Sequence, residues 1–487
     1  MTHPMTPELT EFFQPGDFPA VLPLVVLTGG ILVLLLGEII DALRPLRPGV
    51  FIATLLGAGA AHVSHLDGGS GLALGGTYVA DERTAAWGLI FLVATFLAWV
   101  YARGYYRTSK AFLGEHDILL LATPIGMTMM AGARDLTVFF IGLELLSIPL
   151  YCLAAFRRAR NESVEAGLRY FVLGAFSVGM FLYGSALLYT ATGTLSLDLM
   201  RGMDTALSSP LALAGVGLIF ASLFFKLSIF PFHLWVPDVY QGAPTPVTVL
   251  MATGTKAAAV AFLLEITFLL PSGAAGFVAL LALATMAAGN LAALAQRDVK
   301  RMLAYSGIAH AGTVLLVAAG ARRAGLEAEA TQAALYYMAA YVVTAGGAFG
   351  LLSWLEADGE RFTRLDSLKG LARRRPGVAA AMTLFMLSLG GIPATGGFLG
   401  KWFVFSVTVR ADMIAVTVLG ALLSVVALGY YLRVVVAMYM EPEPEGQFPP
   451  LTQKASATFA TAFCASMVLL LGVLPGSFLE GIFRISG

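Results

Sequence analysis

Long apolar runs recur along the whole chain, and short polar segments separate them. Runs such as GLIFLVATFLAWV and ATAFCASMVLLLGVL are continuous, whereas the strands of a membrane β-barrel would show ~10-residue segments of alternating polarity. Because a membrane-spanning helix needs roughly 20 mostly apolar residues, the pattern predicts spanning helices. We expect fourteen of them, near residues 19–41, 49–63, 83–103, 116–133, 135–156, 162–190, 210–231, 245–270, 273–295, 300–320, 331–355, 377–408, 413–440 and 455–480.

The composition of the chain supports this fold class. Hydrophobic residues make up 58% of the 487 positions and charged residues only 12%, about half of the ~25% that soluble domains carry. Thirty basic residues balance thirty acidic ones, which argues against the excess of positive charge typical of nucleic-acid-binding proteins. We therefore predict an all-α polytopic membrane protein that lies in the lipid bilayer and binds no nucleic acid.

Positive charge is unevenly divided between the two predicted sides of the membrane. With spans of alternating direction, eighteen lysines and arginines, Lys300 among them, lie in loops after odd-numbered spans, and seven lie on the opposite side. Loops rich in lysine and arginine stay in the cytoplasm, so we expect both chain termini on the other side. No extramembrane stretch exceeds about twenty residues, which is too short for a separate domain.

Several ionisable side chains interrupt the apolar runs far from their ends. Lysines stand in GLIFASLFFKLSIFPF, VLMATGTKAAAVAFLLE and GGFLGKWFVFSV as Lys226, Lys256 and Lys401, and Glu144 and His310 lie in two further spans. An ionised side chain at the centre of a bilayer costs ~2.5 to 3.5 kcal/mol, so such residues are functional candidates. A structural ion pair is the alternative for any single pair. The series as a whole favours a proton relay, because it contains groups that take up and release protons.

Two of these spans are also predicted to be broken helices. Pro231 and Pro237 follow Lys226, and Pro393 lies between glycine pairs eight residues before Lys401. Proline and glycine free backbone carbonyls, which must then be satisfied inside the protein or in a hydrated cavity. A buried lysine beside each break therefore predicts a water pocket.

The spacing of the candidate residues indicates an internal duplication. Glu144 and Lys226 are 82 positions apart, His310 and Lys401 are 91 apart, and the two pairs are offset by 166 and 175. Repeats with an odd number of spans must have opposite orientations in the membrane. We therefore expect one membrane domain, 1–487, made of first spans at 19–103, two inverted five-helix repeats at 115–270 and 275–440, and a last span at 455–480.

The motifs around these residues resemble those of a known family. FKLSIFPFHLWVPDVYQGAPTPV, TGTKAA, RMLAYSGIAHAG and LSLGGIPATGGFLGKW are similar to segments of the antiporter-like membrane subunits of respiratory complex I, and the similarity covers most of the chain. Within that family the sequence most resembles the subunit N branch, the counterpart of mitochondrial subunit 2. It ends without the long lateral helix of subunit L, and it has Lys401 where subunit M has glutamate.

The resemblance implies roles for five residues. Glu144 matches the family's fifth-span glutamate, which pairs with the seventh-span lysine, here Lys226. Lys256 matches the connecting lysine of the eighth span, His310 the central histidine, and Lys401 the terminal lysine of the second half-channel. The resemblance thus implies proton translocation through a mid-membrane relay of Glu144, Lys226, Lys256, His310 and Lys401.

Four further residues are expected to tune this relay. Arg169 stands where relatives can have a lysine, and since arginine stays charged it cannot hand on a proton. Glu265, ~13.5 Å along the helix from Lys256, either lines an outside exit or is an interfacial acid. His233 follows the first break and has a structural or water-organising role. Tyr305, one turn from the histidine, packs there or hydrogen-bonds to the relay.

The chain itself has no sequence signature of a redox centre or metal site. It has no CxxC, no GxGxxG after a strand and no paired histidines in the middle of a span for haem. Cys152 and Cys464 stand alone in apolar runs, and we expect both to be core residues. We therefore expect no cofactor and no metal on this chain.

The resemblance implies partners that carry the redox chemistry. FMN and iron–sulfur clusters are expected on other subunits, and subunit M and the small subunits K and J are expected neighbours. The implied location is a bacterial inner membrane, with both termini periplasmic. Two alternatives stay open from the sequence: a subunit of an Mrp-type sodium/proton antiporter, and a structural membrane scaffold with no transport role.

Overall fold

The computed structural model describes residues 14–66, 68, 71–106, 113–356, 363–443, 455–476 and 481. The helices of the first half are α2 (Phe18–Ile39), α3 (Arg47–His65), α4 (Glu82–Tyr105), α5 (Leu113–Gly132), α6 (Leu136–Ala154), α7 (Asn161–Thr192), α8 (Leu197–Met200), α9 (Asp204–Leu207), α10 (Pro210–Leu227), α11 (Trp235–Gly242), α12 (Thr245–Ala252) and α13 (Gly254–Glu265). Those of the second half are α14 (Ala275–Leu294), α15 (Val299–Ala324), α16 (Glu327–Glu356), α17 (Leu371–Arg374), α18 (Pro376–Gly390), α19 (Gly396–Arg410), α20 (Ile414–Tyr439) and α21 (Ala455–Val473). Short 3-10 helices are η1 (Pro15–Asp17), η2 (Asp41–Leu46), η4 (Thr267–Leu269), η5 (Ser272–Ala274) and η6 (Leu365–Leu368).

The predicted all-α membrane fold class is confirmed. Within the described ranges, twelve helical segments are long and apolar enough to cross a membrane. The two other predicted spans correspond to α5 and to the consecutive pair α18 and α19. The proline-rich segment that begins at residue 441 falls largely outside the described residues.

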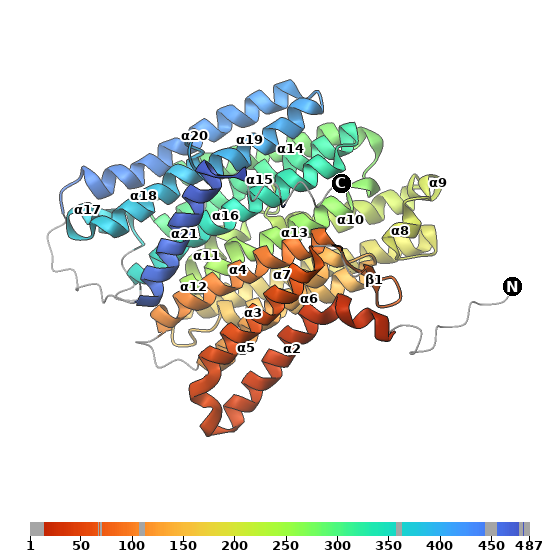
Figure 1. Ribbon diagram of the computed structural model, residues 1–487. Coiled ribbons are helices and arrows are strands. Elements are labelled where there is room, and N and C mark those ends of the chain that lie inside the picture. The colour runs from red at the N-terminus through yellow and green to blue at the C-terminus, as the bar shows by residue number, and fades with distance from the viewer. Residues whose placement is uncertain are drawn as a thin grey trace.

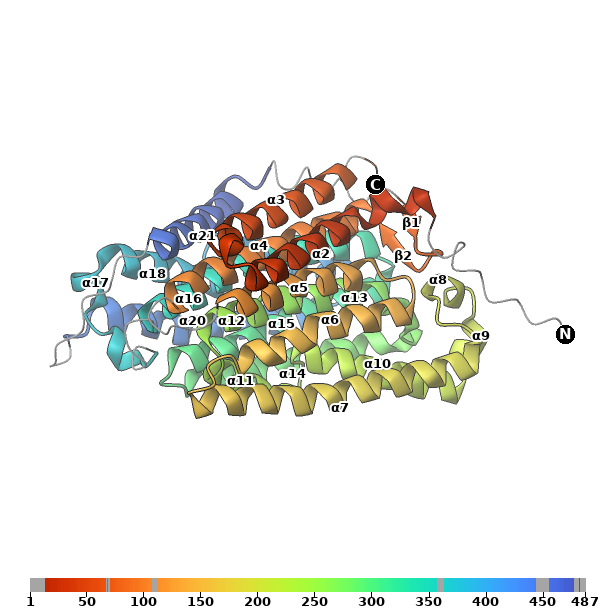
Figure 2. The ribbon, with the colours of Figure 1, turned by 90° about the horizontal axis from the view of Figure 1, so that it is seen from below.

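The long helices lie side by side as one bundle, with the chain order running across it (Figure 1). The segments α12, α13, α15 and α16 are almost wholly buried, whereas α2, α3, α7 and α20 expose many large apolar side chains. α7 runs along the edge of the bundle opposite α3 (Figure 2). An apolar periphery around a buried polar centre suits a protein whose solvent is lipid.

A short β-hairpin between α3 and α4 was not predicted. β1 (Gly71–Ala73) pairs antiparallel with β2 (Tyr78–Ala80), in the register Gly71 to Ala80, Leu72 to Val79 and Ala73 to Tyr78. Two consecutive glycines with positive φ in the connecting turn, Gly75 and Gly76, let the chain reverse. Three residues a strand are too few for the alternating pattern to be visible in the sequence.

Helix ends are set by local capping residues. The carboxylates of Asp81, Asp135 and Asp298 accept hydrogen bonds from the first-turn amides of α4, α6 and α15. Gly193 and Gly325 take left-handed conformations after α7 and α15 and end those helices. These caps satisfy amides and carbonyls that would otherwise be unpaired at the helix ends.

Both predicted helix breaks are present. α10 ends at Leu227, followed by Ser228 with a φ of 67°, and α18 ends at Gly390, followed by Gly391 with a φ of 84°. The predicted eighth span is also divided, which was not foreseen: α12 ends at Ala252, and α13 begins two residues later. Three interrupted helices therefore lie inside one bundle.

Close backbone contacts hold several helix pairs together. A Cβ atom added to Gly184 on α7 would lie 2.7 Å from the carbonyl oxygen of Gly215 on α10, and one added to Gly215 would lie 2.7 Å from the oxygen of Gly184. The hydrophobic effect does not drive helices together in lipid, so association depends on close packing of this kind. Gly179 also lies on α7, but a Cβ atom added there would have no other atom within 4 Å.

This difference gives a matched test of the packing. Gly184→Ala should lower the thermal stability of the detergent-solubilised protein, because α7 and α10 must move apart, at a cost of about 1 to 3 kcal/mol. Gly179→Ala should leave stability unchanged or raise it, because alanine favours the helix and meets no neighbour. Equal unfolding midpoints for the two variants would contradict the proposed contact.

Candidate functional site

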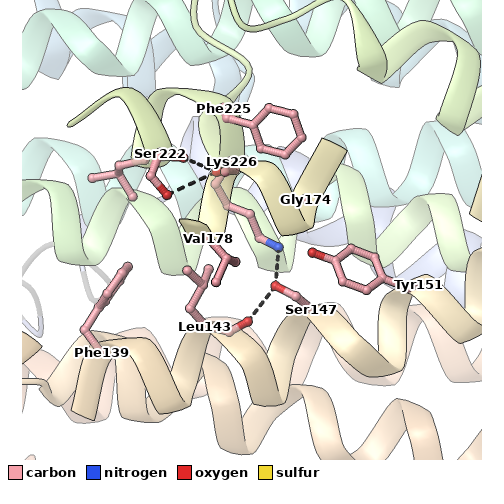
Figure 3. Close-up of a pocket in the computed structure, with 11 residues that line it drawn as sticks. Phe139, Leu143, Ser147, Tyr151, Gly174, Val178, Ser222, Phe225 and Lys226 are labelled. Atoms are coloured by element: carbon pink, nitrogen blue, oxygen red, sulfur yellow. Dashed lines mark hydrogen bonds between the residues drawn. The ribbon is translucent and has the colours of Figure 1, made fainter. Parts of the chain in front are cut away.

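Lys226 is buried at the end of α10, just before the first helix break. Its Nζ donates hydrogen bonds to Ser147 Oγ at 2.7 Å and to Tyr170 Oη at 3.3 Å. Figure 3 shows the amine directed toward Ser147, with the hydroxyl of Tyr151 on the same side. The side chain is 6% exposed and borders a cavity of about 10 Å³, measured as the space open to the centre of a water molecule. That space holds roughly one water.

Glu144 lies near Lys226 but is not paired with it in this structure. It is the ninth residue of α6, one helical turn before Ser147, so both side chains lie on one face of the helix. Its Oε1 is buried without a hydrogen-bond partner, and among the described residues no ion pair of 4 Å or less joins it to Lys226. The contact that the family resemblance implies is therefore open here, and the serine hydroxyl holds the amine instead.

Lys401 occupies the second broken helix. It is the sixth residue of α19, and its Nζ donates to the carbonyl oxygens of Leu389 at 2.9 Å and Gly390 at 3.1 Å. These are the last two residues of α18, whose unpaired carbonyls carry partial negative charge. The break thus supplies the oxygen ligands that a buried ammonium group needs.

Lys256 lies between the two broken helices. It is the third residue of α13, is 3% exposed, and donates to the carbonyl oxygen of Gly307 on α15 at 2.5 Å. A Cβ on Gly307 would lie 3.0 Å from both Lys256 Nζ and Tyr341 Oη, so the amine and this hydroxyl converge on the glycine. Glycine at this position gives the lysine room to reach the α15 backbone.

His310 has both ring nitrogens bound by tyrosine hydroxyls. Nδ1 lies 2.6 Å from Tyr337 Oη on α16, and Nε2 lies 3.1 Å from Tyr431 Oη on α20. The Tyr431 hydroxyl also lies 2.5 Å from Ser306 Oγ. His310 and Lys401 border a common cavity of about 10 Å³, again room for one water.

Tyr305 packs against a neighbouring side chain, which is one of the two roles expected for it, and no hydrogen bond joins it to the relay among the described residues. The structure places its ring beneath the guanidinium of Arg301, with Arg301 Cζ 5.9 Å from the ring centre. The tyrosines that bind the histidine come from α16 and α20, distant in sequence. Buried tyrosine hydroxyls need hydrogen-bond partners, so the Tyr-Tyr pairs at 336–337 and 430–431, two of the three in the sequence, were the only signal that could have pointed to them.

Arg169 lies in a charged cluster apart from the three central lysines. It is half exposed and pairs with Glu165 at 2.5 Å and Asp238 at 2.9 Å, and Asp238 in turn binds Arg301 at 2.6 Å. His233, between α10 and α11, is buried, and its Nδ1 has no hydrogen-bond partner in the described part of the chain. Among the residues that the structure describes, neither Arg169 nor His233 is hydrogen-bonded to one of the three central lysines.

A wide charged cavity of about 510 Å³ opens beside Arg169. Lys300, which the sequence placed in a loop, is instead buried in its wall. The Lys300 amine donates to the carbonyls of Gln241 and Ala243, where α11 gives way to α12, and lies 3.7 Å from Glu356. Its position at a helix start gave no sequence signal of this burial.

Glu265 is held by three arginines. Its carboxylate accepts from Arg134 at 2.6 Å, Arg201 at 2.8 Å and Arg83 at 2.9 Å, and it is only 4% exposed. It is the last residue of α13, the helix that carries Lys256. The cluster therefore fixes one end of that helix to the first turn of α4 and to the segments that precede α6 and α9.

Candidate metal and redox positions are sparse. Across the described ranges, no three histidine, cysteine or carboxylate side chains come close enough to hold a metal ion. Both cysteines are free thiols; Cys464 is buried as predicted, whereas Cys152 is exposed, so its assignment to the core is wrong. Cys152 lies on α6 on the outer face of the bundle.

Comparisons with known proteins agree on one family. A family model described as NADH:quinone oxidoreductase/Mrp antiporter, TM matches residues 133–427. The chain is 40% identical to NADH-quinone oxidoreductase subunit N of Myxococcus xanthus, covering 95% of this chain and 96% of that relative. It is 37% identical to the subunit of the same name from Trichlorobacter lovleyi, covering 97% of both.

Solved structures give the same result. A chain of respiratory complex I from Thermus thermophilus matches with a TM-score of 0.80 and 34% identity, covering 96% of this chain and all of that one. A chain of the Mrp complex from Dietzia sp. has a TM-score of 0.81 at 20% identity, covering 96% and 97% of the two chains, which is a likeness in fold.

The three-arginine cluster predicts a large effect of removing its acid. Glu265→Ala leaves three guanidinium groups close together without their shared partner, which should cost about 3 kcal/mol and lower the thermal unfolding midpoint of the purified protein. Asp198→Asn is the matched control, because this half-exposed carboxylate lies 3.6 Å from Arg134 and should contribute less than ~1 kcal/mol. Similar midpoints for the two variants would show that the cluster does not anchor α13.

Proposed function

The chain belongs to the NADH-quinone oxidoreductase subunit N family, and on that basis we propose that it translocates protons as a membrane subunit of a respiratory NADH:quinone oxidoreductase. The observation that carries the proposal is a row of titratable groups that are costly in a membrane domain: Glu144, which is half-buried, and the buried side chains of Lys226, Lys256, His310 and Lys401. They come from α6, α10, α13, α15 and α19, so the row runs through the whole bundle.

The energies involved fit a switch at the first lysine. A membrane potential of 150 to 200 mV opposes each outward proton by ~4 kcal/mol. Two unit charges 4 Å apart interact by about the same amount at an effective dielectric near 20. Closing and opening the contact between Glu144 and Lys226 is therefore sufficient to move a proton against the field. Ser147 holds the amine while that contact is open.

The second half of the relay continues from Lys256. This lysine reaches the α15 backbone at Gly307, one turn from His310, and the histidine shares a water-sized cavity with Lys401. Lys401 is then the last group of the relay. It alternates between a state bound to the carbonyls that end α18 and a state released from them. Arg169, Glu265 and His233 act on the relay from a distance, through charge and helix position.

The two halves support an inverted-repeat origin. α10 and α18 each end at a residue in the left-handed conformation, Ser228 and Gly391, and each end lies beside a buried lysine, Lys226 or Lys401. The repeats then extend over residues 115–270 and 275–440, between the first spans and α21. Repeats of this kind place the functional groups near the middle of the membrane.

The redox chemistry that drives pumping lies on other subunits. FMN and iron–sulfur clusters are carried by those partners, and subunit M and the small subunits K and J are the neighbours within the membrane arm. The complex lies in a bacterial inner membrane, with both termini of this chain on the periplasmic side. The alternative, an Mrp-type antiporter subunit, is supported by the shared family model and the shared fold, whereas the relatives at 37% to 40% identity are named as subunit N.

Replacing the relay lysines tests the function directly. In the purified complex reconstituted into vesicles, Lys226→Ala and Lys401→Ala should each lower proton translocation by about tenfold or more. Each substitution removes the amine that takes up and releases the proton at that step. The measurement is proton uptake per NADH oxidised, followed with a pH-sensitive dye.

Lys369→Ala is the matched control. This lysine lies at the surface, where it pairs with Asp366 and Glu441, and its removal should leave coupling unchanged. Fully coupled pumping by both relay variants would rule out the relay and favour a structural scaffold.

A further inference from the structure

The hydrogen-bond chain around His310 is continuous over four side chains. Tyr337 Oη meets Nδ1 at 2.6 Å, Nε2 meets Tyr431 Oη at 3.1 Å, and Tyr431 Oη meets Ser306 Oγ at 2.5 Å. The chain ties α15 to α16 on one side and to α20 on the other. All four side chains are buried.

Counting donors and acceptors shows that the protons of this hydrogen-bonded series can be arranged in two equivalent ways. A neutral imidazole has one N–H donor and one acceptor nitrogen, and each hydroxyl has a single proton. If Tyr337 donates to Nδ1, then Nε2–H donates to Tyr431, and Tyr431 donates to Ser306. If every bond reverses, Ser306 donates to Tyr431, Tyr431 to Nε2, and Nδ1–H to Tyr337. The heavy atoms need not move between the two arrangements.

We propose that the hydroxyls of Tyr337, Tyr431 and Ser306, together with His310, form a proton wire that joins the two halves of the relay. This proposal rests on the proton translocation proposed above, and it names the side chains that carry the proton between Lys256 and Lys401.

The transfer step conserves every proton. A proton arriving at Tyr337 Oη binds there as the hydroxyl proton passes to Nδ1. The Nε2 proton moves to Tyr431 Oη, the Tyr431 hydroxyl proton moves to Ser306 Oγ, and the Ser306 proton leaves to the next acceptor. One proton enters and one leaves, four side chains end as neutral as they began, and rotation of the hydroxyls with ring tautomer exchange restores the first arrangement.

Both ends of the wire lie beside relay lysines. Ser306 immediately precedes Gly307, whose carbonyl oxygen binds Lys256 Nζ at 2.5 Å. At the other end, Tyr337 packs against Gly400, the residue before Lys401: a Cβ on Gly400 would lie 3.2 Å from Tyr337 Cδ2. His310, the second member of the wire, borders the water-sized cavity that also has Lys401 in its wall. The wire therefore lies between the connecting lysine and the terminal lysine, where the relay otherwise has a single histidine.

The structure offers a close control for the tyrosines. Tyr336, next to Tyr337 on α16, is also buried, but its hydroxyl donates to the carbonyl oxygen of Leu471 on α21. Replacing either tyrosine with phenylalanine removes one hydroxyl and preserves the ring. Of these two neighbouring tyrosines, only Tyr337 contacts the histidine through its hydroxyl.

The experiment compares three phenylalanine variants in the intact complex reconstituted into vesicles. Tyr337→Phe and Tyr431→Phe should lower the rate of proton translocation by about tenfold or more, and Tyr336→Phe should leave it unchanged. The rates are measured in H₂O and in D₂O, because slowing at the wire makes hydrogen transfer rate-limiting and raises the solvent isotope effect, which a packing defect would not do.

Defined outcomes separate this inference from the proposed function. If Tyr337→Phe and Tyr431→Phe pump as fast as Tyr336→Phe while Lys226→Ala does not pump, the wire is wrong and the lysine relay stands. If Lys226→Ala also pumps fully, the proposed function itself fails. If the phenylalanine variants do not assemble, Ser306→Ala provides the test, since it removes the hydroxyl at the end of the wire with a smaller change in side-chain volume. Unchanged pumping by Ser306→Ala would overturn the wire.

Discussion

The structure depends on one constraint: an amine buried in a membrane domain must find oxygen ligands within the protein. Bulk water and lipid headgroups are out of reach at that depth, and an unsolvated charge there costs several kcal/mol. Lys401 is bound by the carbonyls that end α18, and Lys300 by carbonyls where α11 gives way to α12. At Lys401 the broken helix supplies the oxygen ligands of the buried amine, whereas Lys226, beside the other predicted break, is held by the hydroxyls of Ser147 and Tyr170.

The same constraint explains why these groups can switch. A carbonyl or a serine hydroxyl holds an ammonium group without neutralising it, whereas a carboxylate holds it with its full charge. Lys226 has both kinds of partner within one turn of α6: Ser147, which it binds here, and Glu144, which has an unpartnered oxygen. Two alternative partners within one turn of α6 give the side chain two positions between which it can switch.

Much of this architecture could be predicted from the sequence, because charges and prolines are rare in apolar runs and are therefore conspicuous. Lys226, Lys256 and Lys401 were found in this way, and so were the breaks at Pro231 and Pro393. Tyr337 and Tyr431 were not, since tyrosine is common in spanning helices, and which tyrosine meets His310 depends on how α15, α16 and α20 pack. Lys300 was missed for a similar reason: at a helix start, only tertiary packing decides whether a lysine is buried.

The central claim is that protons cross the interior of this subunit along one connected polar line. It is tested most directly by a structure of the assembled complex in lipid that resolves ordered water during turnover. The account predicts waters or hydroxyls bridging every gap from Glu144 through Lys226, Lys256 and His310 to Lys401 in at least one state. A gap closed by apolar side chains in every state, with no water between neighbouring titratable groups, would contradict it.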